Sequence, residues 1–363
     1  MTKEVIKGYK FRIYPNEEQK NKIEKHFSCC RYVYNGMLAY RQHRYKDFGE
    51  KYSKFDLNKK LTEIKKSDTW LKEVDSKSLL FAIRDMDRAY ENFFKGRGKF
   101  PKFKSKRNNK QSYTTYQLNV KDSLINLPKI GKIKIRLHNG FEKDFYIESE
   151  CTVSKAPTGK YYVSILWKET IETYNKVNKE IGIDLGVKTF ATTSDCEFFK
   201  FPKKVWKEEK RIQFLQNKLS RQKRGSNRYE KTRILISKHH EKITNIRKDF
   251  LHKLSTKCIK ENQLIALENL NVKGMMKNRK LARAIGRMGF YQFRSMLESK
   301  AKWHDRDIRI IDRWFPSSKT CSNCGHIKED LKLSDRTYIC PKCGLVIDRD
   351  YNASINILLE SKK

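Results

Sequence analysis

The chain has 363 residues, of which 38% are hydrophobic and 12% aromatic. That is enough apolar material for cores in two or three domains of roughly 100–200 residues, and it excludes a disordered polycation. Lys and Arg number 81 against 42 Asp and Glu, a formal net charge of +39. A compact protein this basic repels itself unless a polyanion neutralises it, so nucleic acid is the expected partner. A membrane surface is the weaker alternative, because the basic residues are spread along the chain.

No apolar run approaches the roughly 20 residues of a transmembrane helix, and the N-terminus lacks the apolar stretch of a signal peptide. We therefore expect a soluble, cytoplasmic protein. Nine cysteines in such a chain are not expected to form a disulfide framework. The scattered ones are interpreted as ordinary buried or half-buried thiols: Cys29, Cys30, Cys151, Cys196 and Cys258.

The N-terminal half indicates a β domain interrupted by helices. Residues 5–14 are rich in β-branched and aromatic types, which predicts a strand that ends at Pro15. Residues 16–95 carry apolar side chains at three- and four-residue spacings, as helices do. Residues 112–167 indicate short strands. We expect a small β-barrel or sheet that pairs with the N-terminal strand and contains the helical segment as an insertion.

A basic connector at residues 96–107 interleaves lysines and arginines with Phe100 and Phe103. This combination suits phosphate contacts and base stacking, although a solvated linker has the same composition. Beyond a polar joint near residues 170–179, the pattern changes to buried strands and long helices. The predicted elements are a strand at 180–186, a very basic helical hairpin at 205–258, a strand at 263–270, a helix at 287–305 and a C-terminal helix.

Each of the two apolar strands has one acid inside its apolar run, Asp184 in the first and Glu268 in the second. A buried carboxylate costs free energy unless a cation or hydrogen-bond donors compensate it. Two further acids, Asp348 and Asp350, precede the C-terminal helix. Carboxylates that converge from rigid elements bind ions of the Mg²⁺ type, and two such ions support phosphodiester cleavage. By spacing alone, any one of these acids could equally be a salt-bridged structural residue.

Four cysteines follow the spacing of a tetrahedral zinc site. Cys321-x2-Cys324 is followed, after fifteen residues, by Cys340-x2-Cys343. Each pair precedes a glycine that permits the turn of a zinc knuckle. Because thiolates would fill all four positions, we expect one structural zinc ion, not a catalytic one. Several basic residues also make the module a plausible nucleic-acid contact: Lys328, Lys332, Arg336 and Lys342.

Together these motifs resemble the transposon-encoded TnpB (OrfB) RNA-guided nucleases, relatives of the type V CRISPR effectors. The ordered matches cover nearly the whole chain. They include Lys10–Asn16, Arg31–Asn35, Leu79–Phe94, Phe100–Lys104, Gly182–Gly186, Ala266–Leu270, Phe315–Ser318, the four-cysteine module and Asp348–Ala353.

The resemblance implies a multidomain α+β fold. An RNase H-like (RuvC) α/β nuclease domain carries a zinc-knuckle insertion, and a β-barrel wedge domain carries an inserted helical recognition lobe. The implied boundaries are 1–15 and 101–175 for the wedge domain, 16–100 for the recognition lobe, 176–314 and 346–363 for the split nuclease domain, and 315–345 for the zinc module.

For the active site, the resemblance implies that Asp184, Glu268 and Asp350 hold two Mg²⁺ or Mn²⁺ ions. It favours Asp350 over Asp348, because the family's metal-binding Asp stands two residues before an Asn. Arg336 matches an arginine that related nucleases keep near the scissile phosphate.

For partners, the resemblance implies a monomeric protein that binds a guide RNA derived from the transposon end. The protein would cleave double-stranded DNA beside a short flanking motif. The basic hairpin would line the nucleic-acid channel. Analogy places the readers of the flanking motif near Lys54, Asn58, Ser76, Lys77 and Thr115.

Three alternatives share some of these features. A nuclease-inactive DNA-binding regulator would be marked by loss of an acid, and all three acids are present. A DNA transposase or its accessory protein could carry the same acids, but the resemblance over the whole chain favours cleavage. An RNA-associated zinc protein without catalysis would leave the two acids on the strands unexplained.

Overall fold

The computed structural model describes residues 2–107, 111–138, 140–141, 145–332 and 334–363. The chain divides into two compact units. One comprises Ile6–Glu169, and the other comprises Met1–Val5 and Thr170–Lys363. Each unit has its own hydrophobic core. None of the helices within the described ranges is long and apolar enough to span a membrane.

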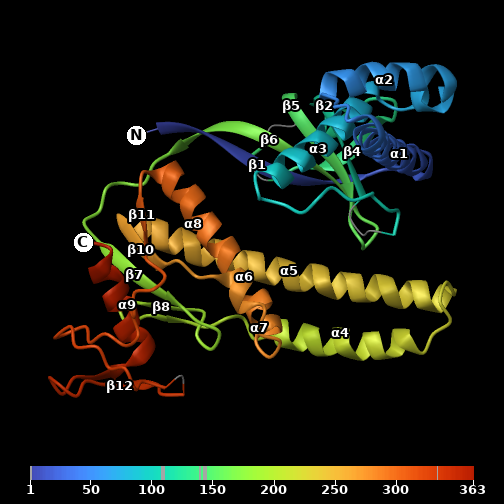
Figure 1. Ribbon diagram of the computed structural model, residues 1–363. Helices are drawn as coiled ribbons and strands as arrows, with labels where there is room; N and C mark the ends of the chain where they lie inside the picture. The colour runs from blue at the N-terminus through green and yellow to red at the C-terminus, as the bar shows by residue number, and fades with distance from the viewer. Residues whose placement is uncertain (1, 108–110, 139, 142–144, 333) are drawn as a thin grey trace. The chain divides into compact units, whose positions relative to one another are not determined.

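Six strands form a closed barrel in the order β1-β4-β3-β2-β5-β6 (Figure 1). They are β1 (Thr2–Tyr14), β2 (Gln111–Lys121), β3 (Leu124–Leu127), β4 (Gly131–Arg136), β5 (Phe145–Lys155) and β6 (Tyr161–Glu172). β1 pairs antiparallel with β4, with Ile13 opposite Ile135. Both side chains are buried, as the two-residue period of a strand with one inward face requires. The prediction that the N-terminal strand pairs with the later strands is therefore confirmed.

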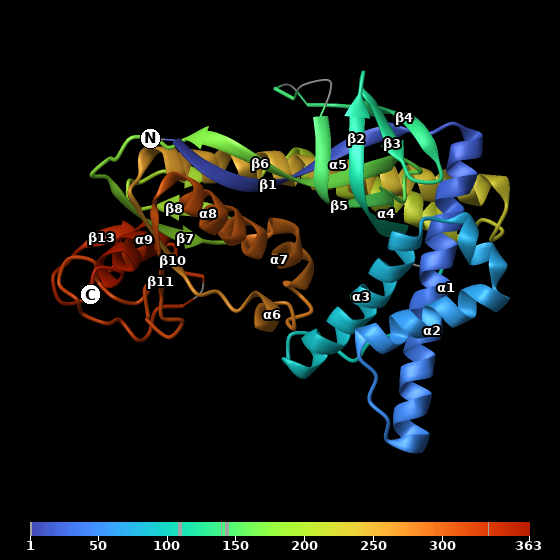
Figure 2. The ribbon, with the colours of Figure 1, turned by 90° about the horizontal axis from the view of Figure 1, so that it is seen from above.

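The helical segment between β1 and β2 consists of α1 (Glu17–Phe48), α2 (Lys54–Ser67), a 3-10 turn (Thr69–Glu73) and α3 (Ser76–Phe94), seen from above in Figure 2. Asn16 begins α1 with a capping box, since its side chain accepts from the Gln19 N–H and its own N–H donates to the Gln19 side chain. Gly49, at a φ of 65°, ends the helix in the left-handed conformation.

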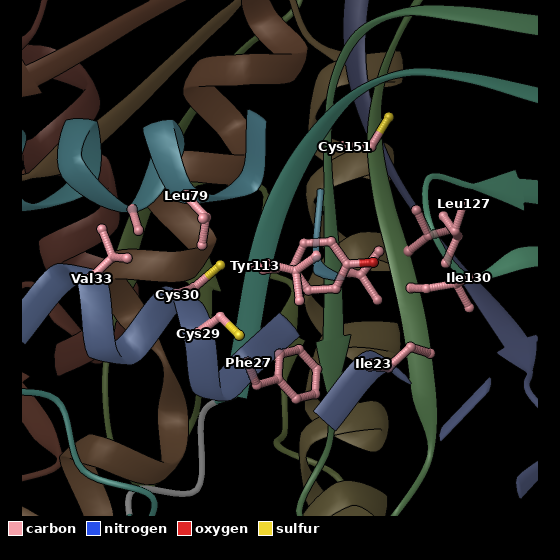
Figure 3. Close-up of a cluster of buried hydrophobic side chains, with 14 of the residues drawn as sticks. Ile23, Phe27, Cys29, Cys30, Val33, Leu79, Tyr113, Leu127, Ile130 and Cys151 are labelled. Atoms are coloured by element: carbon pink, nitrogen blue, oxygen red, sulfur yellow. The ribbon is translucent and has the colours of Figure 1, made fainter. Parts of the chain in front are cut away.

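Helices and barrel share one core, in which Tyr113 of β2 has its ring 5.8 Å from that of Phe27 on α1 (Figure 3). Cys29, Cys30 and Cys151 are buried in this core, as expected, and Cys258 is buried in the other unit. The prediction was wrong for Cys196, which lies in the turn after a short strand and is exposed.

The second unit contains a five-stranded sheet in the order β11-β10-β7-β8-β9. Its strands are β7 (Glu180–Leu185), β8 (Ala191–Thr193), β9 (Phe198–Phe199), β10 (Leu264–Glu268) and β11 (Asp307–Ile311). β10 is parallel to both β7 and β11, whereas β8 is antiparallel to β7 and β9. The remaining elements are α4 (Lys204–Ser220), α5 (Asn227–Glu261), α6 (Val272–Met275), α7 (Ala282–Met288), α8 (Phe290–His304), β12 (Thr337–Ile339), β13 (Val346–Asp348) and α9 (Arg349–Glu360).

The predicted basic hairpin is formed by α4 and α5, which lie side by side in Figure 1. Glu208 of α4 joins the two arms, because its buried carboxylate lies 2.6 Å from both His239 Nδ1 and Lys242 Nζ of α5. The helix predicted at 287–305 is confirmed as α8, which begins at Phe290, whereas the short helix α7 before it was not predicted. Gly289 separates α7 from α8 at a φ of 75°, a conformation that a helix interior does not adopt.

Candidate active site

Asp184 and Glu268 lie at the carboxyl ends of two neighbouring parallel strands. In the register between β7 and β10, Ile183 is opposite Leu267, so the two acids occupy the next position along the pair. Side chains at paired positions of neighbouring strands point to the same face of the sheet. The carboxylates are therefore neighbours because of strand register, although the chain separates them widely.

The helix α9 brings Asp350 to the same place. A Cβ added to Gly182 of β7 would lie 2.1 Å from the Ser354 carbonyl oxygen, so the helix backbone rests directly on this glycine. Asp184 lies two residues beyond Gly182 on the same strand face, and Asp350 lies one helical turn before Ser354. The close approach of helix and strand thus places the third carboxylate beside the first.

Asp348 has a different task from Asp350. Its Oδ1 accepts hydrogen bonds of 3.0 Å from the N–H groups of Asp350 and Tyr351, which makes it the N-cap of α9. The structure thereby separates the two neighbouring acids: one begins the helix and the other faces the sheet.

The environment of the site raises the pKa of two of its carboxyl groups. The pKa of Asp184 is raised well above its usual range, first by burial and then by the charges of Glu268 and Asp350. Burial also raises the pKa of Glu268, and the hydroxyl of Ser317, which donates to Glu268 Oε1, opposes this shift. A divalent cation would relieve both effects, and a set of carboxylate oxygens is the type that Mg²⁺ and Mn²⁺ prefer. The residues present therefore fit such an ion.

A chain of hydrogen bonds connects this site to the cysteine module. The side-chain amide of Asn356 on α9 donates to the carbonyl oxygens of Ser317, at 2.8 Å, and Thr320, at 2.6 Å. Asn352, one turn earlier, donates to the Thr320 oxygen and accepts from the Ser322 N–H. Both asparagines and Ser317 are buried. The segment that leads into the first cysteine pair is thus fixed against α9 and Glu268.

The four cysteines form a compact cluster whose sulfur atoms all lie within 4.8 Å of one another. Gly325 and Gly344 have φ values of 73° and 72°, and their N–H groups donate to the carbonyl oxygens of Cys321 and Cys340. The N–H of Leu345 and the Asn323 amide lower the pKa of the Cys343 thiol to about 6, which favours the thiolate that zinc requires. This cluster fits the predicted structural zinc ion.

Arg336 lies at the edge of the β12–β13 hairpin. Its carbonyl oxygen accepts a 2.8 Å hydrogen bond from the N–H of Arg349, the first residue of α9. Asp350 is the next residue of that helix, and the side chain of Arg336 is exposed. The geometry places the arginine next to the start of the helix that carries the third acid.

The predicted motif readers lie in the other unit. Asp75, the N-cap of α3, accepts from the Lys77 N–H and from the hydroxyl of Thr115 at 2.8 Å, so these positions meet around one carboxylate. Ser76 and Lys77 are exposed, whereas Thr115 is fully buried. Lys54 and Asn58 lie one turn apart on α2. Lys54, Ser76 and Lys77 are therefore exposed to solvent, whereas Thr115 is not.

The sequence pattern gave no structural role to Ser317, Asn352 or Asn356. Phe315–Ser318 stood out only as a segment of resemblance, without a role. A signal was available in retrospect, because Asn352 and Asn356 are four residues apart and so share one face of a helix. Polar amides on the buried face of a helix predict partners in another segment.

Three family models match the chain. They are described as "Probable transposase" over residues 163–279, "Cas12f1-like, TNB domain" over 290–357, and "Helix-turn-helix domain" over 1–51. The first span contains Asp184 and Glu268, and the second contains the four cysteines and Asp350. The described residues of the third span form a strand and one long helix.

Relatives match over almost the full chain. A protein of Streptomyces pristinaespiralis named "Putative RNA-guided DNA endonuclease" is 37% identical over 99% of this chain and 90% of its own. One of Escherichia coli K12, named "Putative RNA-guided DNA endonuclease InsQ", is 31% identical over 97% of this chain and 92% of its own. The chain belongs to this family, the transposon-associated TnpB (OrfB) proteins.

Among solved structures, the protein in a cryo-EM structure of a Cas12f1–sgRNA–target DNA complex overlaps 98% of this chain and 99% of its own, with a TM-score of 0.38 and 16% identity. A second, in a CRISPR–Cas12f ternary complex, overlaps 94% of this chain and 80% of its own, with a TM-score of 0.40 and 15% identity.

Proposed function

We propose that this protein is an RNA-guided, metal-dependent DNA endonuclease whose active site is formed by Asp184, Glu268 and Asp350. The observation that carries the proposal is the convergence of three carboxylates at the carboxyl ends of β7 and β10. Two of these carboxyl groups have raised pKa values. Acids arranged in this way are unfavourable unless they hold cations. The names of the full-length relatives support guided DNA cleavage as the use of such a site.

In this proposal the unit from Thr170 is a split RuvC nuclease of the RNase H-like class, residues 176–314 and 346–363, with a zinc module at 315–345. The sheet order β11-β10-β7-β8-β9, with the acids on the central strands and the last helix across them, supports this class. The barrel, residues 1–15 and 101–175, serves as the wedge domain and residues 16–100 as the recognition lobe.

The three acids would hold two Mg²⁺ or Mn²⁺ ions, which supply an activated water and neutralise the leaving oxygen of the phosphodiester. Ser317 keeps the Glu268 carboxylate oriented through its hydroxyl. Arg336, which is exposed beside the start of α9, would contact the scissile phosphate. The four cysteines hold zinc, which fixes the segment against which Asn352 and Asn356 bond.

The partners in this proposal are a guide RNA from the transposon end and double-stranded target DNA, bound by a monomer. The net charge of +39 supports extensive phosphate contacts, as a guided nuclease needs. The flanking motif is read near Lys54, Asn58, Ser76 and Lys77. Thr115, which is buried, contributes by holding Asp75 at the start of α3.

The test uses the protein with the RNA that copurifies with it, which is sequenced first. A discrete transposon-end RNA and Mg²⁺-dependent cleavage of matched duplex DNA are expected. Asp184→Asn should lower the cleavage rate on the order of a thousandfold or more while target binding persists, because the residue contributes to the chemical step. The matched control is Asp195→Asn, an exposed acid of the same unit that pairs with Lys179.

Normal cleavage by Asp184→Asn would show that the site is assigned wrongly. Guided binding by the wild-type protein without any cleavage would identify it as a nuclease-inactive regulator.

A further inference from the structure

The two most exposed large hydrophobic side chains in the described part of the chain belong to segments that contact the end of β10. Trp314 is 84% exposed and Tyr291 is 76% exposed. Trp314 lies in the loop after β11, and Tyr291 lies in the first turn of α8. Large aromatic rings in water are unfavourable, and two of them on segments that contact one strand end indicate a binding surface.

The loop that carries Trp314 is fixed at both ends to the end of β10. Before it, Arg313 Nε donates to the carbonyl oxygen of Asn269 at 3.2 Å. After it, the Ser317 hydroxyl donates to the carboxylate of Glu268. The Trp314 N–H also bonds to Asp312 Oδ1 at 2.7 Å, which tightens the turn. The exposed ring is therefore carried by a short loop whose two ends are anchored at Glu268 and Asn269.

Tyr291 approaches the same acid from α8. Tyr291, Arg294 and Glu268 line one small cavity of about 40 Å³. Arg294 Nη1 donates to Asn269 Oδ1 at 3.1 Å, and its Nε donates to Glu298 at 2.8 Å. Asn269 thus holds one arginine through its side chain and another, Arg313, through its main chain. Each aromatic residue therefore has an anchored arginine near it in sequence, and Arg294 also lines the same cavity as Tyr291.

Exposed rings combined with fixed cations match the chemistry of single-stranded nucleic acid. Bases stack on aromatic faces, and guanidinium groups bind the phosphates between them. Stacking needs unpaired bases, because neighbouring base pairs cover these faces in a duplex. An apolar peptide segment would need a deeper groove than the 40 Å³ cavity provides.

We propose that Trp314 and Tyr291 stack on bases of the DNA strand being cut, while Arg313 and Arg294 bind its phosphates on either side of Glu268. This rests on the proposed nuclease function and adds the residues that hold the substrate strand. The strand would reach the carboxylates unpaired, with a base held on each side of the reacting phosphodiester.

The main experiment measures cleavage by the guide-loaded protein on DNA in which one nucleotide at a time is abasic. Trp314→Ala and Tyr291→Ala should each raise KM about tenfold, with kcat changed less, because stacking binds the strand. For wild type, an abasic nucleotide at the stacked position should cause the same loss. Combined with the matching alanine variant, it should cause no further loss.

Trp314→Phe and Tyr291→Phe keep an aromatic face and should stay close to wild type. Phe198→Ala, which removes an exposed ring from the far edge of the same sheet, should show no dependence on the abasic position. The proposal would be overturned if both alanine variants kept the wild-type KM. It would also be overturned if the loss from each alanine variant added to the loss from an abasic nucleotide at every position.

A second measurement separates this inference from the nuclease assignment. A short single-stranded DNA containing 2-aminopurine is mixed with the Asp184→Asn protein, which need not cleave. Stacking should quench the fluorescence, and Trp314→Ala should remove most of the quenching. If the Asp184→Asn protein quenches the fluorescence but the wild type shows no guided cleavage, the nuclease assignment is wrong and the strand-binding surface is supported. Normal cleavage with quenching unchanged by both alanine substitutions overturns the surface alone.

Discussion

The four-cysteine cluster and the carboxylate site lie in one unit but differ in how far they are assembled. The four sulfur atoms already lie within 4.8 Å of one another. Among the described residues, no other group of three or more histidine, cysteine or acidic side chains brings its ligand atoms so close together. Asp184 lies near enough to Glu268 and Asp350 for their charges to raise its pKa, but the three carboxylates do not form such a group.

The difference follows from what each centre has to do. A structural zinc site is closed by its protein ligands, whereas a catalytic metal site must leave positions for substrate oxygens. The cysteines come from two short knuckles with their own turns, so local geometry suffices to gather them. Asp184, Glu268 and Asp350 come from two strands and a helix, so only the tertiary fold brings them together. The cysteine cluster is expected to stabilise the fold, whereas the carboxylates depend on the fold for their positions.

The largest effect that tests this contrast should come from removing zinc. Chelation should lower the melting temperature of the unit that contains the cysteines, because structural zinc contributes about 10–16 kcal/mol in isolated zinc-finger peptides. Cleavage should fall as well, since the segment bonded by Asn352 and Asn356 would lose its support. Calorimetry together with a zinc assay measures both the loss of metal and the loss of stability.

Cys321→Ser should reproduce the effect of chelation, and Cys196→Ser is the matched control because this thiol is exposed and outside the cluster. Unchanged melting after confirmed zinc loss would remove the structural role and, with it, the contrast between the two centres.

Much of this contrast could be predicted from sequence, but not the contacts that carry it. The cysteine spacing is local, so it predicted the cluster directly. Asp184 and Glu268 were predicted as candidate metal ligands because each is the one charge inside an apolar run of a strand. The sequence could not show that Gly182 lies against the Ser354 backbone, since that approach depends on the register of β7 and the path of α9.

Ser317 illustrates the same limit. Serine is a common residue type, so its presence in the sequence predicts no particular contact. The fold shows that Ser317 is buried and donates to Glu268. The short helix α7, which ends at Gly289, was missed for a related reason. Gly289 is tolerated within a helical pattern, and tertiary packing decides whether the helix continues through it.

A smaller effect should come from Ser317, because it joins the two centres. Ser317→Ala removes the hydroxyl that orients Glu268, and loss of such a supporting hydrogen bond typically costs about 10–100-fold in metal affinity or activity. Titrating Mg²⁺ against cleavage rate should show a higher half-saturating concentration. Ser317→Thr keeps the hydroxyl and should recover much of the loss.

The neighbouring Ser318 offers a matched control, and Ser318→Ala should titrate like wild type. An unchanged Mg²⁺ requirement in Ser317→Ala would mean that the carboxylate is positioned without this hydroxyl.

The smallest effect concerns stability and pH. The raised pKa of Asp184 means that the folded protein holds this proton more tightly than the unfolded chain. The free energy of unfolding therefore decreases as pH rises from the unfolded pKa of about 4 through the higher folded value. Asp184→Asn cannot ionise, so it should melt at a higher temperature than wild type at neutral pH in metal-free buffer. Each kcal/mol relieved corresponds to roughly 2–4 °C in a unit of this size.

This difference should shrink toward pH 4, where the wild-type carboxyl is protonated, and the shared zinc site cancels from the comparison. Mg²⁺ should then raise the melting temperature of wild type more than that of Asp184→Asn, because the ion offsets the repulsion only where the charge exists. Parallel melting curves at all pH values, with equal responses to Mg²⁺, would show that the three carboxylates do not repel one another. The carboxylate site would then be as relaxed as the cysteine cluster, and the strain that favours cation binding would have to come from elsewhere.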